Sequence, residues 1–282
     1  MPIGRHRTSL RKRRSESMTF IAAMDNSGGS AGGVLDTYGQ PWTEEDKMEK
    51  IHAFRMRMIN SAMFDNRFID AAILYRDSVE RGAVPTLKSK GINAILKIDS
   101  GTNELGLLKD FDIDEMIQYA VKHDCYGTKM RSIISDVSMI DKVLIQQFKL
   151  AEKIYKNNLM PIVEPEIDIH NPNKATIEDI LVKSLTTYCQ RMKGKCILKL
   201  TLPDLPNTYL PLLKIHSVQR LVGLSGGYTT KQACERLSLN KNMEASFSRA
   251  LSERLYYTDP DPFFETAIAS NISNIVEGSK AG

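Results

Sequence analysis

Residues 196–202 read CILKLTL, a short apolar run with one lysine, Lys199, at its centre. Such a run is typical of a strand buried on both faces, as in a parallel sheet that helices cover. Seven further runs with this character recur along the chain, at residues 19–25, 70–76, 93–99, 125–131, 159–165, 220–226 and 243–248. The repetition predicts a sheet of eight strands.

Helical periodicity fills the stretches between these runs. Apolar residues recur there every three or four positions in three stripes, at 48, 51, 54 and 58, at 140–154, and at 177–188. Thr43 and Thr229 each open a capping-box pattern. Strands alternating with helices over about 260 residues predict one domain at residues 18–282, a (β/α)8 TIM barrel of the α/β class. The alternative is an open doubly wound sheet, although no G-x-G-x-x-G follows the first run.

Positive charge is concentrated at the amino terminus. The chain carries +4 overall and residues 1–17 carry +5, so the rest sums to −1 and is not a basic nucleic-acid surface. We expect residues 1–17 to be a solvated, disordered leader, with a basic arm for nucleic acid or membrane, or a transit peptide, as alternatives. No apolar run approaches a membrane span, and the four cysteines have no metal spacing. These features predict a cytoplasmic protein.

Polar residues gather where the predicted strands end. In a TIM barrel the chemistry sits at the carboxyl ends of the strands. The polar residues at these ends are Asp25, Lys97, Lys129, Glu164, Glu166, Lys199, Ser225 and Arg249. Because side chains alternate along a strand, Ile197 and Lys199 share one face, and Ile162 and Glu164 share another. If those faces point inward, three lysines and at least three carboxylates converge in one cavity.

Three lysines in apolar strands indicate amine chemistry. A single lysine at a strand end is more simply explained by its ammonium reaching water. Three of them weaken that explanation. Burial and nearby cations lower the pKa of a lysine, and the neutral amine that results attacks a ketone to form a Schiff base. Carboxylates then carry the protons of dehydration and bond cleavage. The residues alone leave open which lysine reacts.

Two glycine-rich segments at strand ends indicate phosphate binding. LSGGY at residues 224–228 leads into a helix, and a barrel's usual phosphate site follows strands seven and eight. Arg249 can close on the same anion. DNSGGS at residues 25–30 offers Ser27 and Ser30 as a second cradle, with Lys97 nearby. The pair predicts a substrate with two phosphates.

In combination these motifs resemble class I fructose-1,6-bisphosphate aldolase, closest to the short bacterial-type members. The resemblance runs from about residue 19 to residue 250 through FIAAMDNSGGS, ILKID, GTKMRS, MPIVEPEI, ILKLTLP, GLSGGY and ASFSRAL, in the family's order. It implies a lyase that reversibly cleaves fructose 1,6-bisphosphate into dihydroxyacetone phosphate and glyceraldehyde 3-phosphate, in glycolysis and gluconeogenesis.

The resemblance also implies a role for each site residue. Lys199 would form the Schiff base, Asp25 would help to remove the C4-hydroxyl proton, and Glu164 would serve the carbinolamine and iminium steps. Glu166 and Lys129 would tune the nucleophile and position the substrate. The implied phosphate and substrate ligands are Ser27, Ser30 and Lys97 for the 6-phosphate, Ser225, Gly226, Gly227, Ser248 and Arg249 for the 1-phosphate, and Arg131.

The chain departs from the long animal-type members in three places. It has Asn26 where they have a glutamate, Ser248 where they have a glycine, and an ending, VEGSKAG, without their tyrosine. The histidines are scattered, so we expect no metal and no cofactor. We expect a phosphosugar substrate, a homo-oligomer, and no need for nucleic acid or membrane. Two alternatives are a Schiff-base aldolase for another phosphosugar and a barrel with an added binding role through its leader.

Overall fold

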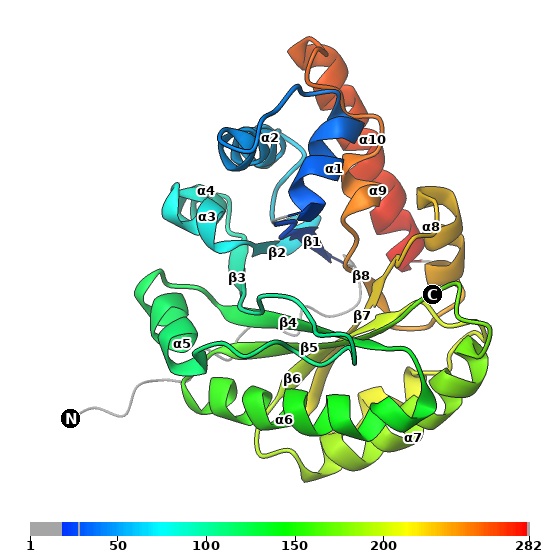
Figure 1. Ribbon diagram of the computed structural model, residues 1–282. Helices are drawn as coiled ribbons and strands as arrows, with labels where there is room; N and C mark the ends of the chain where they lie inside the picture. Colours follow the sequence, from blue (N-terminus) through cyan, green and yellow to red (C-terminus); the bar gives the residue numbers. More distant parts are fainter. Residues whose placement is uncertain (1–18, 28, 281–282) are drawn as a thin grey trace.

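The structure is a computed structural model that describes residues 19–27 and 29–280. The predicted leader at residues 1–17 lies outside the described residues. The described chain forms one parallel sheet in the order β1-β2-β3-β4-β5-β6-β7-β8 (Figure 1). The strands are β1 (Phe20–Met24), β2 (Ile69–Leu74), β3 (Asn93–Lys97), β4 (Gly127–Ile134), β5 (Met160–Ile167), β6 (Cys196–Thr201), β7 (Val218–Leu224) and β8 (Glu244–Ala245). Each lies within or overlaps a predicted run, and the TIM-barrel prediction is confirmed.

Helices lie outside the sheet and connect its strands (Figure 1). The α-helices are α1 (Gly29–Tyr38), α2 (Lys47–Asn60), α3 (Arg76–Glu80), α4 (Ala83–Ser89), α5 (Ile113–Lys122), α6 (Ile140–Lys156), α7 (Lys174–Arg191), α8 (Thr230–Ser238), α9 (Arg249–Ser252) and α10 (Asp261–Lys280). Two 3-10 helices, η1 (Val137–Met139) and η2 (Leu210–Lys214), complete the set. None of the described helices is both long and apolar enough to cross a membrane.

The helix starts follow the local sequence. Thr229 accepts a hydrogen bond from the Gln232 main chain while the Gln232 side chain accepts one from Thr229, so the predicted capping box opens α8. Thr43 and Asp46 exchange the same pair of bonds ahead of α2. The three predicted apolar stripes form the buried faces of α2, α6 and α7.

The barrel is nearly closed between its first and last strands. Strand β8 has two residues and pairs with β7. Ala23 of β1 donates its main-chain N–H to the carbonyl of Phe247, just after β8, at 3.2 Å. This contact brings the segments after β1 and after β8 together, although they lie more than 200 residues apart in the sequence.

The core has an inner and an outer layer. Ile162 and Ile197 belong to the cluster inside the barrel, whereas Val163 and Leu198 belong to the larger cluster between the sheet and the helices. Because side chains alternate along each strand, Lys199 and Glu164 must lie on the inner faces of their strands. The predicted inward orientation of these faces is therefore confirmed.

An ionic cluster fills the opposite end of the barrel interior. Arg220 of β7 pairs with Asp70 of β2 at 2.6 Å and with Glu244 of β8. These side chains are 10%, 20% and 20% exposed, respectively. The cluster joins three strands at the amino-terminal end, away from the strand ends where the polar residues of the site lie.

Candidate active site

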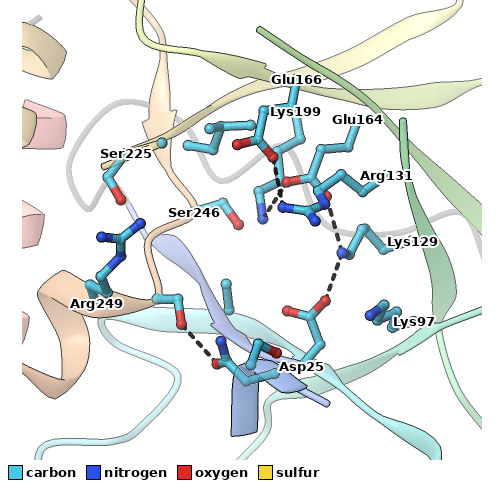
Figure 2. Close-up of a pocket in the computed structure, with 16 residues that line it drawn as sticks. Asp25, Lys97, Lys129, Arg131, Glu164, Glu166, Lys199, Ser225, Ser246 and Arg249 are labelled. Atoms are coloured by element: carbon cyan, nitrogen blue, oxygen red, sulfur yellow. Dashed lines mark hydrogen bonds and ion pairs between the residues drawn. The ribbon is translucent and has the colours of Figure 1, made fainter. Parts of the chain in front are cut away.

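A polar cavity of about 210 Å³ lies at the carboxyl ends of the strands (Figure 2). It is lined by twelve of the residues singled out in the sequence: Asp25, Ser30, Lys97, Lys129, Arg131, Glu164, Glu166, Lys199, Ser225, Gly226, Ser248 and Arg249. Two others lie beside it. The Ser27 hydroxyl accepts a hydrogen bond from Lys97 at 3.1 Å, and Gly227 follows Gly226 in a turn.

A chain of ion pairs crosses the floor of the cavity (Figure 2). Lys199 Nζ lies 3.0 Å from Glu164 Oε1, and the other oxygen of Glu164 lies 3.1 Å from Lys129 Nζ. Lys129 Nζ lies 2.6 Å from Asp25 Oδ2. All four side chains are at most 13% exposed. Protons and charge can therefore be exchanged along a line that begins at Lys199 and ends at Asp25.

Electrostatics keep the two carboxyl groups in this chain ionised. Burial alone would raise the pKa of Asp25, but attraction to Lys129 and Lys199 outweighs it and holds the pKa well below its usual range. The same balance lowers the pKa of Glu164. Burial works to lower the pKa of Lys129, yet Asp25 and Glu164 raise it strongly. Lys129 is thus held as an ammonium ion.

The three lysines differ in their carboxylate neighbours. Lys129 contacts two carboxylates, Lys199 contacts one, and Lys97 lies 3.7 Å from Asp99. The cavity is therefore a set of paired charges, because a buried ammonium ion needs a counter-charge to remain stable. Two partners make the proton of Lys129 hard to remove. Lys199 has the single carboxylate partner Glu164.

The main chain at Glu164 is held by a buried glutamine of α6, on the outer side of the sheet. Gln147 of α6 accepts from the Glu164 N–H at 3.1 Å and donates to the Glu164 carbonyl at 3.2 Å. It also donates to Ser132 of β4 at 2.9 Å. Gln147 has no exposed surface. The pair of bonds locks the strand position that carries the central carboxylate.

Glu166 occupies a second carboxylate position two residues further along β5. Its Oε2 accepts a hydrogen bond from Arg131 at 3.0 Å. Burial raises the pKa of Glu166, and repulsion from Glu164 adds to this, while Arg131 opposes it. Within one cavity, the pKa of Glu164 is thus lowered and the pKa of Glu166 is raised. Opposite shifts in neighbouring carboxyl groups are typical of acid–base sites.

The wall formed by β7 and β8 offers donors for an anion. Gly226 has φ +58°, a conformation that favours glycine, and the Tyr228 N–H closes the turn on the Ser225 carbonyl at 3.0 Å. Ser225 and Arg249 face each other on this side, away from the lysines (Figure 2). The turn leads directly into α8, whose amino terminus adds positive potential.

The opposite wall is the segment between β1 and α1. The Ser30 hydroxyl accepts from the Ser27 N–H at 3.0 Å and donates to the Ser27 carbonyl at 2.8 Å. Lys97 reaches the Ser27 hydroxyl from β3. This wall therefore combines two hydroxyl groups with a cation, and Lys97 lies across the ion-pair chain from Arg249 (Figure 2).

Several residues at the site were not assigned a role from the sequence. Asn26 and Ser246 line the cavity, and the Ser246 hydroxyl is buried without a hydrogen-bond partner among the described residues. Both lie inside quoted motifs, so strand-end position was a usable signal. Gln147 and Arg55 are buried residues of α6 and α2. In the sequence, each could have been noticed as a polar or charged residue on an apolar helical stripe. Among the described residues, no group of histidine, cysteine or acidic side chains is arranged to hold a metal ion.

Comparison with known proteins places the chain in a family. No protein-family model matches it. It is 37% identical over 286 residues to a class 1 fructose-bisphosphate aldolase of Clostridium acetobutylicum, covering 95% of this chain and 97% of the relative. A protein with the same description from Synechocystis sp. is 37% identical over 298 residues, covering 99% of each chain.

Solved structures share the fold. Fructose-bisphosphate aldolase from Plasmodium falciparum superimposes with a TM-score of 0.76 at 17% identity, over 94% of this chain and 91% of that chain. The sequence relatives match almost their full length, which establishes the relationship independently of the fold. The chain belongs to the class 1 fructose-bisphosphate aldolase family.

Proposed function

We propose that the protein reversibly cleaves fructose 1,6-bisphosphate into dihydroxyacetone phosphate and glyceraldehyde 3-phosphate through a Schiff base on Lys199. The observation that carries the proposal is the ion-pair chain from Lys199 through Glu164 and Lys129 to Asp25. It supplies one amine for the covalent step and a carboxylate near each place where a proton must move. The names of the sequence relatives support the same substrate.

The first half of the reaction is imine formation. Glu164, 3.0 Å from Lys199 Nζ, takes a proton from the ammonium, and the free amine attacks the C2 carbonyl carbon of the open-chain sugar. A proton then passes to the C2 oxygen, and loss of water leaves the iminium ion. Glu164 suits both transfers because it contacts the reacting nitrogen directly, so it can hold the proton taken from the ammonium and then give it to the C2 oxygen. Its partner Lys129 favours the ionised carboxylate before the first transfer and after the second.

The second half is carbon–carbon cleavage. Asp25 takes the proton of the C4 hydroxyl, the C3–C4 electron pair moves to the iminium, and the aldehyde departs. The product left on Lys199 is an enamine, which gains a proton at C3 and is hydrolysed. The low pKa of Asp25 keeps it ready to accept a hydrogen bond from that hydroxyl, and Lys129 holds its carboxylate in place.

The two anion-binding walls support a bisphosphate. We propose that Ser225, Gly226, Gly227, Ser248 and Arg249 bind the 1-phosphate, and that Ser27, Ser30 and Lys97 bind the 6-phosphate. The side chains of Arg249 and Lys97 lie on opposite sides of the cavity, which supports a sugar that extends between them with a phosphate at each end (Figure 2). Arg131 and Glu166, paired at 3.0 Å, are proposed to contact the sugar between them.

Cellular context is a further part of the proposal. We propose a cytoplasmic homo-oligomer that needs no cofactor. Size-exclusion chromatography with light scattering gives the mass in solution, and a monomeric mass would contradict the oligomer.

Covalent trapping tests the central step. The protein is incubated with dihydroxyacetone phosphate, reduced with borohydride and digested, and the modified peptide is identified by mass spectrometry. We expect one modified residue, Lys199, and no modification of a Lys199→Arg variant, which lacks a usable lone pair. Modification of Lys97 or Lys129 would overturn the assignment, and the absence of any adduct would overturn the mechanism.

A further inference from the structure

Arg55 is a charged residue on the buried face of a helix. It lies in α2 between Ile51 and Met58, on the same apolar stripe, and only 2% of its surface is exposed. It is among the largest fully buried side chains of the described residues. An arginine in such a position is unusual, because burying a guanidinium ion costs several kcal/mol unless good partners compensate.

The partners of Arg55 are uncharged oxygens. Nη1 donates to the Ser78 hydroxyl at 2.8 Å, and Nη2 donates to the main-chain carbonyl of Asn26. Burial lowers the pKa of Arg55 to about 10, against the opposing effect of Asp25 and Asp77, so the side chain is still a cation at neutral pH. A methionine would fill this space at lower cost, which indicates that the hydrogen bonds are the reason for the arginine.

The carbonyl that Arg55 holds belongs to the segment carrying Asp25. Asn26 follows Asp25 directly, and its side chain is held from the other direction, because the Ser248 hydroxyl donates to its Oδ1 at 3.1 Å. Arg55, Asn26 and Ser248 line a void of about 20 Å³ beside the main cavity. On this side, therefore, the segment is fixed by hydrogen bonds rather than by close packing.

We propose that Arg55 is a positioning residue: through the main-chain carbonyl of Asn26 it fixes the carboxylate of Asp25 against Lys129 in the orientation needed for carbon–carbon cleavage. The inference deepens the proposed function and rests on it. Arg55 is absent from the lining residues of the cavity, and its hydrogen bond reaches the segment of Asp25 through the main chain of Asn26. A loss of alignment of about 1 Å at a reacting group lowers a rate by about 100-fold.

The inference separates two steps of the reaction. Cleavage of the bisphosphate needs a base at the C4 hydroxyl, the role proposed for Asp25. Imine formation with dihydroxyacetone phosphate has no such requirement, because that molecule has no C4, and it depends on Lys199 and Glu164. A residue that acts through Asp25 must therefore affect cleavage more than trapping, whereas a general loss of folding lowers both together.

The test uses the full chain with Arg55→Met and Arg55→Lys, the second retaining a cation that can reach one of the two oxygens. Steady-state cleavage of fructose 1,6-bisphosphate gives kcat and KM, and borohydride trapping with dihydroxyacetone phosphate gives the competence of Lys199. Arg57→Met is the matched control. Arg57 lies on the same helix and also binds carbonyls, those of Tyr256 and Tyr257, but far from Asp25 in the chain.

We expect Arg55→Met to lower kcat by about 10- to 100-fold while trapping stays within about twofold of the parent. The kcat of Arg55→Lys should lie between those of the parent and Arg55→Met. Arg57→Met should lower the thermal midpoint and leave kcat unchanged. If Arg55→Met does not fold, Arg55→Lys decides. A kcat within twofold of the parent in the folded Arg55 variants, or trapping that falls in parallel with kcat, overturns the inference.

A double-mutant cycle with Asp25 distinguishes a positioning role from a purely structural one. It compares the effect of Arg55→Lys on the cleavage rate in the presence and absence of the Asp25 carboxylate. If Arg55 acts through Asp25, Arg55→Lys should lower single-turnover cleavage much less in an Asp25→Ala background than in the parent. Equal factors in the two backgrounds overturn the inference. A parent protein that neither traps dihydroxyacetone phosphate nor cleaves the bisphosphate would instead overturn the proposed function, and the inference with it.

Discussion

At the scale of single residues, the distinguishing feature is the pairing of each buried lysine. Lys199 and Lys129 are at most 5% exposed in their side chains, and Glu164 lies between them with one oxygen on each. The partner of a buried charge decides its chemistry: an ammonium between two carboxylates stays charged, and one with a single carboxylate has a ready proton acceptor. Lys199, the lysine that the family resemblance selects, has Glu164 as its one carboxylate partner.

The balance at Lys129 predicts how stability depends on pH. The pKa values of Asp25 and Glu164 are depressed, so their contribution to stability is fully present above about pH 4 and is lost as the pH falls further. In a Lys129→Met variant, burial without this cation raises both values. The folded variant then binds more protons than the unfolded one, and its free energy of unfolding should increase as the pH falls from 7 towards 5.

Urea unfolding at pH 7 and pH 5 measures this difference. We expect Lys129→Met to be less stable than the parent at pH 7 and the gap to narrow at pH 5. Lys153→Met, which breaks an exposed pair with Asp114, is the control and should show no such narrowing. A gap that is constant or wider at pH 5 would count against the assignment of Lys129 as the main counter-charge.

A second residue-scale prediction concerns Arg249. Its side chain lies at the edge of the cavity opposite Ser225, where a guanidinium fits phosphate oxygens in a bidentate manner (Figure 2). Arg249→Ala should raise KM strongly for fructose 1,6-bisphosphate and for fructose 1-phosphate, and much less for a substrate that lacks the 1-phosphate. Arg191→Ala, at the end of α7, is the control. Equal effects on all substrates, or a change in thermal stability alone, would contradict a phosphate role.

At the scale of elements, every strand except β2 places residues in the lining of the cavity, at its carboxyl end or directly after it. Neighbouring strands are in register at the active positions: Lys97 pairs with Lys129, and Arg131 pairs with Glu164. Gly127 begins β4 where an added Cβ would lie 2.1 Å from the Met160 carbonyl, so the close approach of β4 and β5 requires glycine. The strands thus place the polar residues of the cavity at their carboxyl ends and structural contacts, such as the one at Gly127, at their amino ends.

The ionic cluster at the other end of the barrel leads to a stability prediction. Arg220→Met would leave Asp70 and Glu244 buried without their shared cation, so we expect a loss of about 3–5 kcal/mol in the free energy of unfolding at pH 7. Lys183→Met, which breaks a pair between side chains 69% and 65% exposed, should cost less than about 0.5 kcal/mol. A similar loss of unfolding free energy for both variants in urea would contradict a larger contribution of the buried cluster to stability.

At the scale of the whole molecule, barrel closure places the segments that follow β1 and β8 in one site. The hydrogen bond from Ser248 to Asn26 joins residues 222 positions apart. The family resemblance marked both positions as departures from the long members, and the fold brings their side chains into contact.

Metal independence is a prediction about the complete enzyme. In the proposed mechanism the iminium on Lys199 withdraws the electrons that a metal ion would otherwise draw from the substrate carbonyl. We expect full cleavage activity after exhaustive treatment with EDTA, with a zinc-dependent aldolase treated in parallel to show that the chelation worked. A loss of activity that added zinc restores would refute the mechanism.

The sequence by itself determined the fold class and the members of the site. Apolar runs alternating with amphipathic stripes are local patterns, and they predicted all eight strands because burial on both faces leaves few other choices. The strand ends named eight residues that line the cavity, because parallel strands in a barrel bring their carboxyl ends together. The glycine-rich segments and the family resemblance added the other four, Ser30, Arg131, Gly226 and Ser248. Element bounds were less certain: β4 extends to Ile134, beyond the predicted end at residue 131, and β8 has only two residues.

Only the tertiary structure decided which charges are partners. The contacts between Lys129 and Asp25, between Lys199 and Glu164, and between Arg55 and Asn26 each join different elements. Their energies depend on distance and burial, which sequence spacing does not contain. For that reason the residues alone left three lysines as equal candidates for the nucleophile. For the same reason, the sequence did not show that Arg55, in the middle of α2, is buried. The folded barrel sets how many carboxylates each lysine meets, two at Lys129 and one each at Lys199 and Lys97.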